Sequence, residues 1–145
     1  HFLLCYTGKP RNSGINNWEV TKKSLDGDKK VIRHLGTIRD CALEMHQLLI
    51  KGRISGIAPI FSREWRARKQ LAPTITTPQM EKLIRSALKK GAFAAKVCGA
   101  GGGGCVAFIV PPGKKQLIID ELNLQGGKVL PFQFVSRGQV TSRQK

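Results

Sequence analysis

The chain has 145 residues, of which 25 are lysine or arginine and 9 are aspartate or glutamate, so its formal net charge is +16 and its isoelectric point is near 10.3. This length, with 41% hydrophobic residues, is enough for one domain with its own core and excludes a disordered chain. No apolar run approaches the roughly 20 residues that a membrane-spanning helix needs, so we expect no membrane partner.

The basic charge raises the alternative of a nucleic-acid-binding module, because an isoelectric point above 9 is typical of such proteins. The lysines and arginines are scattered in small groups, however, and the aromatic residues do not alternate with them. This pattern favours a solvated basic surface, or one that attracts phosphorylated small molecules, over a nucleic-acid partner.

The first half of the sequence predicts one strand and three helices. The ranges, in chain order, are a strand over 2–6, a loop over 7–14, and helices over 27–52, 54–71 and 77–91. The helices follow from apolar residues that recur every three or four positions. Pro59 places a start or a kink in the second helix, while Thr77 and Pro78 supply a cap and a first-turn residue for the third.

The second half predicts three strands and one helix. The ranges are strands over 94–98, 105–110 and 128–136, and a helix over 114–124. The order of strand, helices, strand, strand, helix and strand fits an α+β sandwich with helices on one face of an antiparallel sheet. In this fold we expect the aromatic rings of the strands, among them Phe108, Phe132 and Phe134, to be buried.

The cysteines and histidines predict no metal site. Four cysteines at 5, 41, 98 and 105 form no C-x-x-C pair, which disfavours both a zinc site and a disulfide framework. We interpret them as reduced core residues of an intracellular, cytoplasmic protein, with a catalytic thiol as the minor alternative. His34 and His46 have no ligand-like spacing and are expected at the surface, so we assign no catalytic residue and no metal ligand.

The most informative segment is the loop over 99–104, which has five glycines in six residues. Such residues allow a positive φ and a close approach of the backbone, and their amides can cradle phosphate oxygens. A strand follows where a dinucleotide-binding motif needs a helix, and no lysine ends the loop as in a P-loop. The sequence therefore predicts a loop built for close approach to a ligand, with a flexible hairpin turn as the alternative.

Three other residues are candidates for binding. Lys96 precedes the loop by three positions and could face a ligand or water. Arg11 and Ser13 lie in the loop over 7–14, where a guanidinium and a hydroxyl could bind an oxyanion or could simply form a turn.

The segment K-V-C-G-A-G-G-G-G-C, from Lys96 to Cys105, resembles the C-terminal glycine motif of the GHMP small-molecule kinases, which include galactokinase, homoserine kinase, mevalonate kinase and phosphomevalonate kinase. Looser similarity over 4–14, 16–18, 56–59 and 71–73 resembles the branch of sugar kinases that includes D-glycero-D-manno-heptose 7-phosphate kinase. Ile60 departs from that branch, in which an acidic residue is expected.

The resemblance implies that residues 1–145 form a ferredoxin-like C-terminal domain with a helical insertion. It implies an ATP-dependent kinase for a sugar or sugar phosphate, whose active site lies between this domain and an N-terminal kinase domain that binds most of the ATP and Mg²⁺. By the same resemblance, the residues that line the interdomain cleft are Gly99, Ala100, Gly101, Gly102 and Gly103. Arg11 and Ser13 would face the sugar or its phosphate.

The sequence also lacks part of what the resemblance requires. No Gly-Leu-Gly-Ser-Ser loop, the N-terminal motif of these kinases that holds ATP phosphates, occurs in it. We therefore expect the chain to be a fragment that has no kinase activity alone. The alternatives are a basic ferredoxin-like module that binds nucleic acid or senses a ligand.

Overall fold

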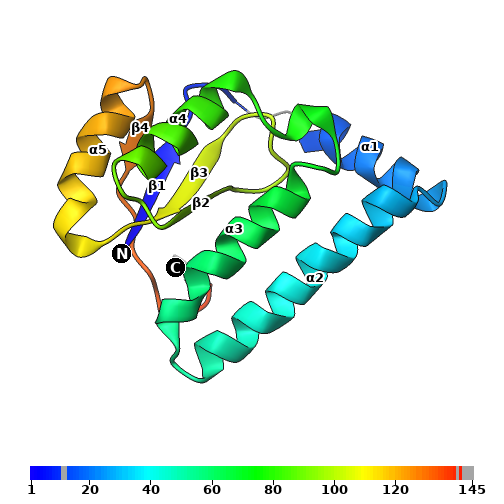
Figure 1. The fold of residues 1–145 in the computed structure, drawn as a ribbon, viewed down its shortest axis with the longest axis horizontal. Coiled ribbons are helices and arrows are strands. Elements are labelled where there is room, and N and C mark those ends of the chain that lie inside the picture. The colour runs from blue at the N-terminus through cyan, green and yellow to red at the C-terminus, as the bar shows by residue number, and fades with distance from the viewer. Residues whose placement is uncertain (11–12, 140, 142–145) are drawn as a thin grey trace, which may run out of the picture.

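The computed structural model describes residues 1–10, 13–139 and 141 (Figure 1). The helices and strands of this part are β1 (Phe2–Tyr6), α1 (Ser13–Leu25), α2 (Lys29–Ile50), α3 (Ile57–Arg68), α4 (Pro78–Lys89), β2 (Ala94–Val97), β3 (Cys105–Ile109), α5 (Lys115–Leu124) and β4 (Lys128–Leu130). Short 3₁₀ turns, η1 (Ile54–Gly56), η2 (Pro73–Ile75) and η3 (Pro112–Lys114), precede α3, α4 and α5.

The four strands form one antiparallel sheet in the order β2-β3-β1-β4. In its register Leu3 lies opposite Phe108, and Cys5 lies opposite both Val106 and Val129. The first strand of the chain is thus a central strand, and the predicted α+β fold with an antiparallel sheet is confirmed.

The main core lies between one face of this sheet and the helices α4 and α5, which lie next to each other in Figure 1. Alternate side chains of the strands enter it, as the period of two requires. Its fully buried members include Phe108 and Val106 from the sheet and Met80, Leu83, Ile118 and Leu122 from the helices. About 2 kcal/mol of transfer free energy accompanies the burial of each such side chain.

The helical insertion is the antiparallel pair α2 and α3, which lies beside the edge strand β2 (Figure 1). Asp28 caps α2 by accepting hydrogen bonds from the amides of Lys30 and Val31. Ile57 of α3 packs on Ala94 and Ile109 in a second, smaller cluster. The insertion therefore extends the core past the edge of the sheet and covers that edge.

Helix α1 is absent from the predicted elements. Asn16 is buried on it and Val20 is half-buried, so α1 has no apolar stripe from which the periodicity could predict a helix. The prediction of a loop through Gly14 was wrong for the start of this helix.

The last predicted strand was too long, because β4 ends at Leu130 and Pro131 follows it. Proline has no amide hydrogen to continue the ladder. Phe108 is buried as predicted, but Phe132 and Phe134 are 42% and 78% exposed, so their predicted burial was wrong. None of the helices in the described part of the chain combines the length and apolar character that a bilayer crossing requires.

Candidate functional site

The glycine loop between β2 and β3 needs glycine at nearly every position. Its φ angles are positive at Gly99 (72°), Gly101 (78°), Gly102 (75°), Gly103 (153°) and Gly104 (80°). Side chains rarely tolerate this region, because Cβ then approaches the neighbouring carbonyl oxygen. The glycine content is thus explained by backbone conformation, and a simple two-residue hairpin turn does not describe the loop.

The protein's own backbone also approaches this loop closely. A Cβ atom on Gly101 would overlap the carbonyl of Ile75, and one on Gly103 would overlap the carbonyl of Pro10. The amide of Gly102 donates to the Ile75 carbonyl at 2.9 Å, and the amide of Gly104 donates to that of Lys9 at 2.8 Å. The close approach expected for a ligand is therefore made, at these positions, by η2 and by the segment after β1.

Asn16 holds the loop from a third side. Its side chain is buried, and its amide nitrogen donates to the carbonyls of Ala100 at 3.2 Å and Thr74 at 3.4 Å. One side chain of α1 thus joins the glycine loop to η2. Sequence reasoning missed this role, since a single asparagine in a polar segment gives no pattern that predicts burial.

These contacts divide the predicted cleft residues into two groups. Gly101 and Gly103 are buried, whereas Gly99 is exposed, and Ala100 and Gly102 are half-buried. The amide of Gly102 already donates to Ile75, and Gly99 is the exposed residue of the five. That the loop binds a nucleotide or substrate stays a prediction.

Two adjoining depressions lie beside the loop, where α4 begins. One, of about 450 Å³, is lined by Asn16, Thr74, Thr76 and Gly102, and the other, of about 390 Å³, by Thr7, Lys9, Gln79 and Gly126. Thr77 and Pro78 line both.

Polar groups in these depressions favour an anionic or polyhydroxylated ligand. Thr7 is buried, and its hydroxyl has no hydrogen-bond partner among the described residues. Thr77 caps α4, whose first turn carries the positive end of the helix dipole. Lys9 adds a cation to the same area. The sequence had indicated Thr77 as a helix cap but not as part of a site, and Thr7 only as the first residue of the predicted loop over 7–14.

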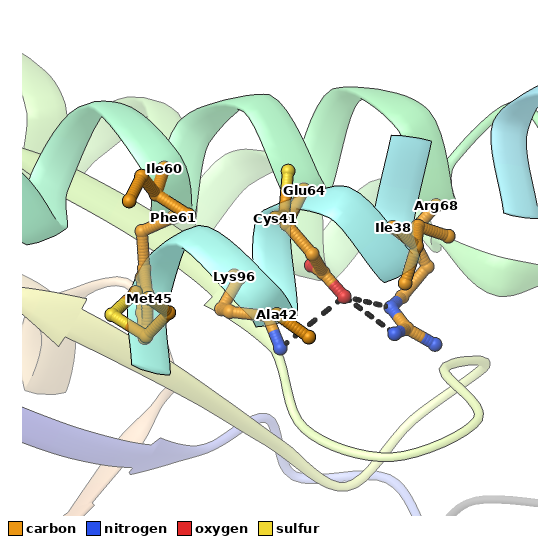
Figure 2. A pocket seen from close by; sticks show the side chains of 9 residues that line it. All are labelled: Ile38, Cys41, Ala42, Met45, Ile60, Phe61, Glu64, Arg68 and Lys96. Carbon is orange, nitrogen blue, oxygen red and sulfur yellow. Dashed lines mark hydrogen bonds and ion pairs between the residues drawn. The ribbon is translucent and has the colours of Figure 1, made fainter. Parts of the chain in front are cut away.

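Lys96 lies in a different place from the other predicted site residues. Figure 2 shows its side chain in a pocket of about 310 Å³ lined by α2, α3 and β2. Its ammonium nitrogen is 3.4 Å from a carboxylate oxygen of Glu64 and 5.6 Å from the ring centre of Phe61. The structure thus places Lys96 in an ion pair with α3 and does not bring it together with the depressions beside the glycine loop.

The carboxylate of Glu64 interacts with two cations in this pocket. Its Oε1 atom accepts a hydrogen bond from Nε of Arg68 at 2.6 Å and pairs with Lys96, while its Oε2 atom is buried with no partner in the described part of the chain. The surrounding side chains, Ile38, Ala42, Met45 and Phe61, are apolar (Figure 2). One carboxylate therefore pairs with two cations among largely apolar side chains, an arrangement that the sequence did not predict.

The remaining predicted residues are Arg11 and Ser13. Arg11 lies outside the described residues, and Ser13 is the first residue of α1. Within the described ranges, no group of three or more His, Cys, Asp or Glu side chains could hold a metal ion.

Cys5 and Cys41 are buried as predicted, but Cys98 and Cys105 are only half-buried. Burial raises the pKa of Cys5 to about 11, an effect that a backbone hydrogen bond at Lys128 partly offsets and the neighbouring Cys105 thiol reinforces. We predict that iodoacetamide modifies Cys105 well before Cys5 at pH 8, where about one Cys5 thiol in a thousand is ionised. Peptide mass spectrometry over a time course measures both rates, and equal rates would contradict the buried position of Cys5.

Comparison with known proteins finds similarity to kinases, both in a family model and in a relative. The model "GHMP kinases C terminal" matches residues 45–128. The chain is 31% identical over 120 residues to a D-glycero-alpha-D-manno-heptose 7-phosphate kinase of Campylobacter jejuni, which covers 83% of this chain and 35% of that protein.

The fold of this chain resembles parts of solved structures. A Lin0012 protein of Listeria innocua superposes with a TM-score of 0.82 at 22% identity, over 92% of this chain and 39% of that one. The phosphomevalonate kinase of Streptococcus pneumoniae, solved with phosphomevalonate and AMPPNP, superposes with a TM-score of 0.74 at 19% identity, over 90% and 38% of the two chains. The chain thus spans little more than a third of the length of these proteins.

Proposed function

Because the chain belongs to the GHMP kinase family, whose C-terminal model matches more than half of it, we propose that it is the C-terminal domain of an ATP-dependent kinase that phosphorylates a hydroxyl group of a sugar or sugar phosphate. The observation that carries this proposal is the family match across the clamped glycine loop and the helices around it. The similarity to a heptose 7-phosphate kinase supports the substrate class. The family match does not support the nucleic-acid-binding alternative.

In this proposal the exposed end of the glycine loop and the two depressions at the start of α4 form one wall of an interdomain active site. Gly99 and Ala100 would present amides to a phosphate group, and the first turn of α4 would favour its negative charge. The contacts of Asn16 and Ile75 hold the loop in place before the ligand arrives, which lowers the entropy lost on binding. The net charge of +16 would attract anionic substrates.

The proposal assigns Mg²⁺ and most ATP contacts to an N-terminal kinase domain. Bound Mg²⁺ would neutralise charge on the phosphoryl group that is transferred. The contribution of this chain would be positioning, through backbone amides of the glycine loop and, with Arg11 and Ser13, through contacts to the sugar or its phosphate.

The gene provides the first test. We expect the reading frame to continue upstream of His1 into a strand and a Gly-Leu-Gly-Ser-Ser loop. An in-frame stop codon close to His1, with no such loop encoded before it, would contradict the proposal.

Activity of the purified 145-residue chain is the second test. We predict no ADP formation above background when the chain is incubated with ATP, Mg²⁺ and a panel of sugars and sugar phosphates, because the residues that would hold the metal and the ATP phosphates belong to the other domain. A coupled assay for ADP measures this. Sugar-dependent turnover by the chain alone would show that it is a complete enzyme.

A further inference from the structure

A groove of about 680 Å³ lies between α3 and α4, next to strand β2. Its apolar lining comes from Trp65, Ile84, Leu88 and Ala95. Its charged residues are Arg66 on α3, Lys69 at the end of that helix, Arg85 and Lys89 on α4, and one carboxylate, Glu81. The groove thus combines an apolar surface with a marked excess of positive charge.

Most of these cations are uncompensated. Lys69 pairs with Glu81 at 3.1 Å and lies 5.5 Å from the ring centre of Trp65. Arg66, Arg85 and Lys89 are exposed, and none of them forms an ion pair with any residue that the structure describes. Glu81 also accepts a hydrogen bond from Thr76 at 2.8 Å, so the one carboxylate of the groove already has two partners.

The spacing of the cations makes the members of each pair neighbours, and both pairs line the groove. Arg66 and Lys69, the residue that caps the end of α3, are three residues apart, and Arg85 and Lys89 are four residues apart on α4. Side chains at these spacings are neighbours, and like charges there repel each other and destabilise the helix. An anion held between the helices would remove this repulsion.

A buried donor lies on a residue that lines the groove. Trp65 is 5% exposed, and its indole N–H has no acceptor in the described part of the molecule. Unpartnered buried donors are rare because they lose their hydrogen bond to water on folding. Because the indole nitrogen is itself enclosed, the accessible donors of the groove are its guanidinium and ammonium groups, which an acceptor-rich anion complements.

We propose that the α3–α4 groove is a binding site for a small phosphorylated molecule. Arg66, Arg85 and Lys89 bind its phosphate groups, for which the planar guanidinium can donate two parallel hydrogen bonds. The non-phosphate part lies on Ile84 and Leu88. The volume falls within the range of pockets for small ligands, about 300–1,000 Å³.

This site differs from the proposed active-site wall. Its lining residues come from 62–69, 81–89 and Ala95, whereas the depressions beside the glycine loop use the first turn of α4 and the residues before it. Binding here requires no phosphoryl transfer, and the inference does not depend on the proposed function.

Trp65 makes the test direct. Because Trp18 and Trp65 are the two tryptophans of the chain, a W18F variant reports on Trp65 alone. We would titrate this 145-residue variant with sodium pyrophosphate at constant ionic strength, following the emission of Trp65 and, in parallel, the heat of binding. The expected result is saturable binding that R66Q/R85Q in the same background weakens at least tenfold.

A charge-matched control separates a site from general electrostatic attraction. K22Q/K29Q removes the same charge from exposed positions of α1 and α2 and should change the affinity less than twofold. The proposal would be overturned if both pairs of substitutions weakened pyrophosphate binding equally. It would also be overturned if the W18F variant had native circular dichroism but gave no saturable heat of binding. Tighter binding of oligo(U) than of pyrophosphate through Arg66 and Arg85 would also overturn it, because the occupant would then be a nucleic acid.

Discussion

A Gly101→Ala substitution is expected to lower the free energy of unfolding by about 3 kcal/mol. Its φ of 78° would cost alanine ~1–2 kcal/mol. The new Cβ would also overlap the Ile75 carbonyl, a backbone group that cannot move aside as a flexible side-chain end could. Displacing it would break the hydrogen bond from Gly102, which is worth about 1 kcal/mol. Urea denaturation followed by circular dichroism measures the change.

Two other glycines separate the causes of this effect. Gly52 has a φ of 64° but open space around it, so Gly52→Ala should show the backbone cost alone, about 1 kcal/mol. Gly36 lies inside α2 with open space and no positive φ, so Gly36→Ala should stabilise the chain by ~0.5–1 kcal/mol. If Gly101→Ala costs no more than Gly52→Ala, η2 does not clamp the loop.

The sequence predicted the elements best where a repeating pattern meets a clear boundary. Thr77 and Pro78 start α4 as predicted, and its apolar face is buried except for Leu88, because capping and periodicity are local properties. Helix α1 escaped prediction because its buried side chain, Asn16, is polar and bonds to groups 58 and 84 residues away. Long-range hydrogen bonds leave no periodic signal.

In the candidate site, too, local features were predicted and long-range contacts were not. The glycines at 99–104 predicted a close backbone approach, but not that the approaching groups would be Pro10 and Ile75 of the same chain. Lys96 was a fair candidate by its position before the loop. Its actual partner, Glu64, lies on another element, and side chains of a strand alternate between faces, so proximity in sequence to the loop did not bring Lys96 toward it.

The pocket around Glu64 depends on one carboxylate to neutralise two cations. Glu64→Gln is expected to lower the free energy of unfolding by about 2 kcal/mol, because it leaves the cations of Lys96 and Arg68 facing each other without their common counter-ion. Removal of one partner of a fully buried ion pair costs about 3–5 kcal/mol. The side chains of Lys96 and Arg68 are 24% and 25% exposed, so water reduces that cost. Urea denaturation measures the difference.

A second substitution tests whether the cost comes from the charge. Lys96→Met removes one of the two cations. It should therefore lower the free energy of unfolding less in the Glu64→Gln variant than in the unaltered chain, with a coupling energy of about 1 kcal/mol. Glu19→Gln is the matched control, because Glu19 pairs with Lys23 on the more exposed surface of α1 and its loss should cost at most ~0.5 kcal/mol. Additive effects of the two substitutions at 64 and 96 would contradict the ion pair. In that case the carboxylate of Glu64 would be held in the pocket by Arg68 alone, and Lys96 would remain free to bind a ligand.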